Sequence, residues 1–150
     1  MRLIADWQDA VPLMAFAFLL AALTTILDTC SLVMVGVAGT SAWQAKLTFA
    51  MARHAVVDLA QVFRTKPSDP KLETSRLLAD DLDRIREILA KHGADLNDGD
   101  EANKKLRELR AMYEPYVCAL SEMLMMQLPP WIVGEDAIDN WKTSAWGRIQ

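Results

Sequence analysis

The most apolar stretch of the chain lies near its beginning. No charged residue occurs from Ala10 to Leu27, and apolar residues continue beyond Asp28 to Gly39. Leu, Ala, Met and Phe dominate this stretch, and Pro12 suits the first turn of a helix, where a backbone N–H is not needed. The pattern therefore predicts one apolar helix over residues 10–39.

An apolar helix of this length has two interpretations. At about 1.5 Å per residue it is long enough to cross a bilayer core of about 30 Å. A helix that is apolar on all sides is therefore either a membrane span or the central helix of a bundle. Asp28 is correspondingly either an intramembrane carboxylate or a buried residue bonded to nearby Thr, Ser or His side chains, and we favour the second.

The next segment, residues 41–63, has the pattern of an amphipathic helix. Its apolar residues recur at three- and four-residue spacing, which predicts one buried face. That face consists of Phe49, Ala52, Val56, Leu59 and Phe63. The polar residues gather on the opposite side: Lys46, Arg53, His54, Asp58 and Gln61.

Two charged segments follow a loop that contains Pro67 and Pro70. Residues 70–92 carry leucine and isoleucine at heptad spacing, and residues 100–127 keep a similar rhythm. The second rhythm continues through Pro115, which predicts one helix kinked there or two collinear pieces. Two helices in tandem with charged outer faces predict an antiparallel hairpin packed on the apolar helices.

The composition changes again in residues 128–150, which contain two prolines and three tryptophans. The prolines end the helix. We expect an irregular tail that Trp131, Trp141 and Trp146 anchor to the helices, because each aromatic side chain buries a large apolar area. These tryptophans are the candidate interface residues.

The overall composition fits a single all-α domain, a helical bundle with a central apolar helix. The chain has 150 residues, 52% of them hydrophobic, enough to bury a core without disulfides or a structural metal. Its formal net charge of −4 provides no basic surface, so we expect no nucleic-acid partner. Cys30 and Cys118 lack metal-binding or disulfide spacing and are expected to be reduced thiols.

Candidate chemistry is sparse. His54 and Asp58 lie four residues apart, a spacing at which two side chains could share a metal ion or act as a base and its orienting group. A small enzyme or metal-binding bundle would need Asp28 to converge with them, and no further ligand is indicated. We therefore predict no catalytic, cofactor-binding or metal-binding residue. Asp28, His54 and Asp58 are instead candidate buried polar residues.

Four segments together resemble a known group of proteins. They are PLMAFAFLLAALTTILDTCSLVMVGV (12–37), QAKLTFAMARHAVVDLAQVF (44–63), YEPYVCALSEMLMMQLPPWI (113–132) and DNWKTSAW (139–146). Their order and texture are similar to the region that follows the pore in bacterial potassium-channel-like membrane proteins, which carry two transmembrane helices and one pore loop. The resemblance implies a cytoplasmic helical domain in which the apolar run is a buried helix. The ion-coordinating filter has no matching positions here.

Two functions follow as hypotheses. The first is a non-enzymatic assembly or regulatory domain on the cytoplasmic face of the bacterial inner membrane. It would be homo-oligomeric, bind no cofactor, and work beside a channel portion in the same or a partner chain. The alternative is a small single-pass membrane protein with one span near residues 11–37 and a cytoplasmic helical hairpin.

Overall fold

The computed structural model describes residues 2–37, 41–69 and 76–132, with side chains from residue 11 onward. Within these residues the chain forms helices and no strands, apart from an isolated bridge between Val37 and Leu96. The predicted all-α class is confirmed. The helices are α1 (Arg2–Gly36), α2 (Ala42–Val62), α3 (Ala79–Lys91), α4 (Asp100–Ala111) and α5 (Glu114–Met123).

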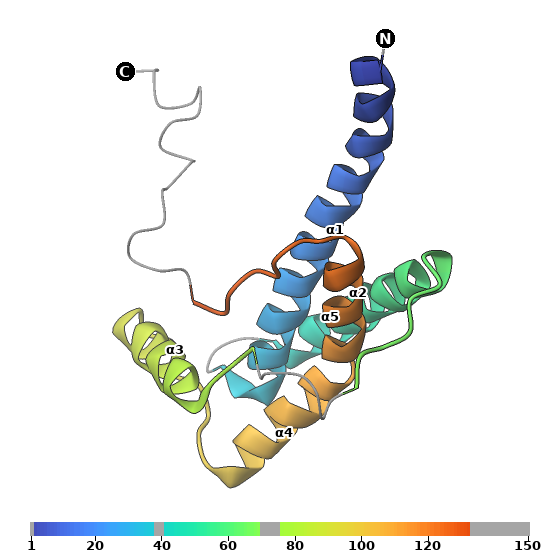
Figure 1. Cartoon of the computed structure of the whole chain (residues 1–150). Coiled ribbons are helices and arrows are strands. Elements are labelled where there is room, and N and C mark those ends of the chain that lie inside the picture. Colours follow the sequence, from blue (N-terminus) through green and yellow to red (C-terminus); the bar gives the residue numbers. More distant parts are fainter. Residues whose placement is uncertain (1, 38–40, 70–75, 133–150) are drawn as a thin grey trace, which may run out of the picture.

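Helix α1 is longer than predicted at its N-terminal end. It begins at Arg2, so Pro12 lies inside the helix rather than in its first turn. The preceding Leu, Ile, Ala, Trp and Gln residues all tolerate helical conformation, which explains the extension. The N-terminal half of α1 projects beyond the other helices (Figure 1). By length and composition, Val11–Gly36 could cross a membrane, which weakly suggests membrane association.

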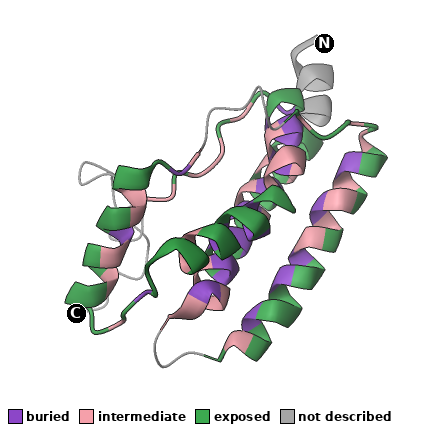
Figure 2. Cartoon of the chain, turned by 90° about the horizontal axis from the view of Figure 1, so that it is seen from below, coloured by how far each residue is buried: buried purple, intermediate pink, exposed green. Residues whose placement is uncertain are grey.

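The core lies between α1 and the helices that flank its C-terminal half. The buried residues of α2 form one stripe, which includes the predicted Phe49, Ala52 and Val56. Leu20 and Leu27 of α1 are fully buried and belong to the same core cluster as these residues of α2. Buried positions face the interior in Figure 2, whereas the outer faces of the helices are exposed. The amphipathic pattern of residues 41–63 therefore predicted the packing face of α2 correctly.

The charged segment expected over residues 100–127 consists of two helices. Helix α4 ends at Ala111, and α5 begins at Glu114 after Tyr113, whose φ of −134° is not helical. Pro115 explains the break, because proline cannot donate to the carbonyl four residues earlier, that of Ala111, and its ring clashes with it. Helix α5 ends at Met123, shortly before Met125 adopts a φ of +51°.

Helix α3 occupies only part of the predicted 70–92 segment. Residues 70–75 lie outside the described residues, and 76–78 are not helical. Ile85 is buried in the core, and Arg86 Nη2 donates to Asn103 Oδ1 of α4 at 2.6 Å. Side chains therefore connect α3 to α4, although α3 stands apart from the other helices in Figure 1.

Candidate functional site

Asp28 is the charged residue of α1's apolar run, and it is buried with 7% of its surface exposed. We expected nearby Thr or Ser side chains to bind it, but Thr24 and Ser31 donate to carbonyl oxygens of their own helix, each at 2.7 Å. Hydroxyls inside helices commonly bond the carbonyl four residues earlier. The side chains that bind Asp28 come instead from distant parts of the chain.

Arg76 and Tyr113 bind the two oxygens of the Asp28 carboxylate. Arg76 Nη2 donates to Oδ2 at 2.9 Å and Nη1 to Oδ1 at 3.3 Å, so the guanidinium contacts both oxygens. The Tyr113 hydroxyl donates to Oδ1 at 2.5 Å. Tyr113 is fully buried, and its ring packs edge-on against Phe49 of α2 with centroids 5.9 Å apart. Charge-assisted bonds of this kind are the strongest hydrogen bonds in proteins.

A second carboxylate completes the arrangement. Glu114 Oε1 accepts a bond from Arg110 Nε at 2.9 Å and lies 3.5 Å from Arg76 Nη1. We name Asp28, Arg76, Arg110, Tyr113 and Glu114 the Asp28 cluster. Its two carboxylates face two guanidinium groups, so the formal charges balance in a region where unpaired charge would be costly.

The Asp28 cluster also holds the segment that follows α5. Arg76 Nη2 donates to the carbonyl oxygen of Pro129 at 2.8 Å. The ring of Trp131 lies beside both arginines, with its centroid 5.9 Å from Cζ of Arg76 and 5.7 Å from Cζ of Arg110. These distances are typical of cation–π contacts. Trp131 is therefore half-buried against the cluster, while Trp141 and Trp146 lie outside the described residues.

Burial and charge shift the pKa values of Tyr113 and Arg76. Burial, followed by the negative charge of Asp28, raises the pKa of Tyr113 far above its ordinary value. Burial alone would lower the pKa of Arg76, but the hydrogen bond and charge of Asp28 outweigh it and raise that pKa. Tyr113 thus stays a neutral donor and Arg76 a cation. The cluster holds four segments together and presents no exposed nucleophile.

His54 and Asp58 do not belong to this cluster, and the expectation that they are buried is wrong. Both are exposed on α2. The reason is that alanine and larger apolar residues occupy the whole buried face of this helix, leaving its polar residues in solvent. No group of three His, Cys, Asp or Glu side chains within the described part of the chain is arranged to hold a metal ion.

The residues that sequence reasoning missed are Arg76, Arg110, Tyr113 and Glu114. A lone aspartate in an apolar helix signals that a cation must meet it, because a buried charge needs a partner. That signal does not identify the cation, since the segment from Arg64 to Arg110 contains many arginines and lysines. Tyr113 fitted the apolar rhythm of residues 100–127 and looked like an ordinary core residue.

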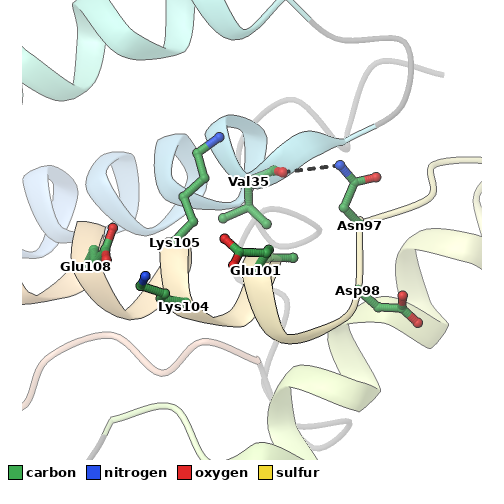
Figure 3. A pocket seen from close by; sticks show the side chains of 8 residues that line it. Val35, Asn97, Asp98, Glu101, Lys104, Lys105 and Glu108 are labelled. Atoms are coloured by element: carbon green, nitrogen blue, oxygen red, sulfur yellow. Dashed lines mark hydrogen bonds between the residues drawn. The ribbon is translucent and has the colours of Figure 1, made fainter.

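A polar groove lies at the C-terminal end of α1 (Figure 3). It measures about 570 Å³ and is lined by Val35, Asn97, Asp98, Glu101, Ala102, Lys104, Lys105 and Glu108. Asn97 Nδ2 donates to the carbonyl of Val35 at 3.3 Å, and Lys105 Nζ donates to that of Met34. These donors satisfy carbonyls that a helix end leaves without partners, and the lysine charge complements the helix dipole.

Gly36 shows how tightly this end of α1 is held. Its φ is +126°, and a side chain there would bring a Cβ atom within 2.2 Å of Asn97 Nδ2. The backbone N–H of Asn97 also donates to the Gly36 carbonyl at 3.0 Å. The groove therefore serves to end α1 and to attach it to the segment before α4.

Comparison with known proteins identifies no relative. No protein-family model, curated protein or solved structure matches the chain. The resemblance to potassium-channel-like proteins stays a prediction.

Proposed function

We propose that the chain is a non-enzymatic assembly domain of a membrane protein complex. The observation that carries this proposal is the uncovered N-terminal half of α1. Five large apolar side chains in this half are exposed, with Phe18 at 71%, Val11 at 59%, Met14 at 56%, Leu19 at 45% and Leu13 at 42%. Contiguous apolar surface of this kind marks a site of contact with a protein or a membrane.

The arrangement of α1 supports attachment through one end of the molecule. Its C-terminal half is packed among α2, α4 and α5, and its first turns project beyond them (Figure 1). The Asp28 cluster and the polar groove both use their charged groups to hold the fold together. The described residues thus favour a binding role over a catalytic one.

The more specific form of the proposal places the chain beside a channel portion on the cytoplasmic face of a bacterial inner membrane. Its support is the resemblance over residues 7–146 together with the projecting N-terminal end of α1 (Figure 1). The domain would then act in assembly or regulation of that complex.

A single span by α1 is the competing proposal, and the packing disfavours it. Met126, just after α5, lies beside Met14 and Phe18, and Phe63, at the end of α2, stacks edge-on against Phe16 at 5.0 Å. A bilayer around residues 11–36 would therefore also surround these neighbouring helices. They expose Asp58 and Glu122, and charges in lipid are costly.

Fractionation of bacterial cells that express the full chain tests the proposal. We expect the chain in the membrane fraction, released by urea because the helix does not span the bilayer. The double variant Leu13→Glu with Leu19→Glu should move to the soluble fraction, since both side chains are exposed on the projecting half of α1. The matched variant Leu47→Glu with Met51→Glu, on the exposed side of α2, should stay with the membranes.

Two outcomes would overturn this view. If the wild-type chain remains wholly soluble, the proposed attachment is wrong. If it stays with membranes after urea and requires detergent, α1 spans the bilayer and the competing proposal is correct.

A further inference from the structure

On the exposed face of α1, apolar residues recur at the heptad spacing that is typical of paired helices. Val11, Phe18 and Thr25 occupy one heptad position, a, and Met14 and Ala21 occupy position d. This face contains no charged residue from Val11 to Thr25. Two helices pack along such a seam when a and d residues are apolar or small. We name these five residues the α1 seam.

An apolar groove lies along the α1 seam. It measures about 250 Å³, and its lining residues are Met14, Ala17, Phe18, Ala21 and Met126. Four of them lie on α1: Met14 at position d, Ala17 at g, Phe18 at a and Ala21 at the following d. In a parallel helix pair, these are the four positions that form the hole for an a residue of the facing helix. The alanines keep the hole open.

Phe18 is the side chain that fits this hole. It sits at an a position, is 71% exposed, and forms one wall of the groove. Because the projecting residue and the hole lie on the same stretch of α1, a two-fold axis between two copies satisfies both sides at once. A surface of this kind is complementary to itself.

We propose that two copies of this chain pair in parallel along the α1 seam, with each Phe18 entering the groove of the other copy. The inference rests on the proposed function, since it names a second copy as the partner of the projecting helix. The pair would extend from Val11 to Thr25, about 21 Å at 1.5 Å per residue. It ends there because Asp28, at the next d position, is bound within its own chain.

Charge favours a second copy over a bilayer as the occupant of the α1 seam. Pairing buries an uncharged face and leaves the exposed Asp58 and Glu122 of the flanking helices in water. Immersion of the same face in lipid would bring these carboxylates toward hydrocarbon. A parallel pair also directs both projecting N-terminal halves to the same side.

Light scattering coupled to size-exclusion chromatography tests the pairing on the full chain without detergent. We expect a dimer for the wild type and a monomer for Phe18→Glu, because the substitution places two carboxylates in the seam. Met51→Glu is the matched control: Met51 is 74% exposed on α2, so its variant should remain dimeric. Circular dichroism should show equal helicity in all three proteins, since neither substituted side chain belongs to the core.

Cross-linking tests the parallel register. In a background with Cys30→Ala and Cys118→Ala, Val11→Cys should form an intermolecular disulfide on oxidation. Equivalent a positions of a parallel pair approach within the range of about 4.4–6.8 Å between Cα atoms that a disulfide requires. Leu13→Cys, on a different side of α1, should remain uncoupled.

A monomeric wild type, a dimeric Phe18→Glu variant, or a Val11→Cys chain that does not couple would each overturn the pairing. A monomer that still enters the membrane fraction would refute the pairing alone and leave the proposed function standing. A dimer confined to the soluble fraction would refute the proposed function and leave the pairing standing.

Discussion

The apolar run of α1, Val11–Gly36, has two halves that lie in different surroundings. Phe18 and Met14 in the first half are largely exposed, whereas Leu20 and Leu27 in the second are fully buried. The buried half is also the one that carries Asp28. Apolar composition alone therefore does not identify the core half. The C-terminal half is covered because other helices supply an apolar face. The partners of its carboxylate, Arg76 and Tyr113, come from the segments just before α3 and between α4 and α5.

Removal of the Asp28 carboxylate, which lies in the buried half of α1, should cause the largest loss of stability. Asp28→Ala leaves the largely buried Arg76 guanidinium without its main partner, which should lower the free energy of unfolding by about 3–5 kcal/mol. Urea denaturation at neutral pH and fixed protein concentration measures this loss. Asp58→Ala removes an exposed carboxylate and should stay within about 0.5 kcal/mol. Similar values for the two variants would mean that the cluster does not stabilise the fold.

The same leucine substitution in each half gives a direct comparison. Leu27→Ala creates a cavity in the core and should cost about 2–5 kcal/mol. Leu19→Ala alters a side chain that is 45% exposed and should cost under about 1 kcal/mol. Thermal or urea unfolding of both variants checks this. Equal losses would show that the first half of α1 is as well covered in solution as the second.

Tyr113 links stability to alkaline pH. Below about pH 10 the phenol is neutral in both states, so its contribution is complete. Above that pH the unfolded chain loses the proton while the folded chain keeps it, and stability should fall by about 1.4 kcal/mol per pH unit. Unfolding curves near pH 9, 10 and 11 measure this slope.

Tyr113→Phe is the variant that isolates this slope. It should lower stability at neutral pH by about 1.5–3 kcal/mol, through loss of the bond to Asp28, and remove the alkaline decline that belongs to this phenol. Tyr116→Phe should keep that decline. An unchanged slope in the Tyr113 variant would contradict the raised pKa.

The smallest effect is expected at Trp131. Trp131→Ala removes the ring beside Arg76 and Arg110, at a cost of about 1–2 kcal/mol from two cation–π contacts. Trp43, 69% exposed on α2, is the matched control, and Trp43→Ala should change stability by less than about 0.5 kcal/mol. If Trp131→Ala is also neutral, the segment after α5 does not contribute to the stability of the cluster.

Local patterns predicted the helices well and their ends less well. The stripe from Phe49 to Val56 was predictable because helical spacing places these residues on one face. The break before α5 was not resolved, since the leucine rhythm continues through Pro115 and periodicity does not register a missing hydrogen bond. The start of α1 was missed because Pro12 was placed in the first turn.

Long-range contacts explain what the sequence left open at the site. Burial of Asp28 followed from its position in a helix expected to form the core, where a carboxylate needs bonding partners. Those partners lie 48 and 85 residues away. Nothing in local spacing selects Arg76 among the charged residues around it. The exposure of Phe18 was equally unpredictable, because it depends on where α2 and α5 end.

The separations within the Asp28 cluster have a consequence for folding kinetics. Asp28 meets Tyr113 across 85 residues, and Arg76 meets the Pro129 carbonyl across 53. The entropy of closing such long loops is lost before the contacts form and stabilise the fold. Folding is therefore slower than in helical bundles whose contacts join residues close in sequence. On the ribosome, α1 emerges long before Tyr113 and Pro129 are made. Until Tyr113 and Pro129 have been made, the nascent chain therefore exposes an apolar helix with an incompletely bound carboxylate, a species prone to aggregation.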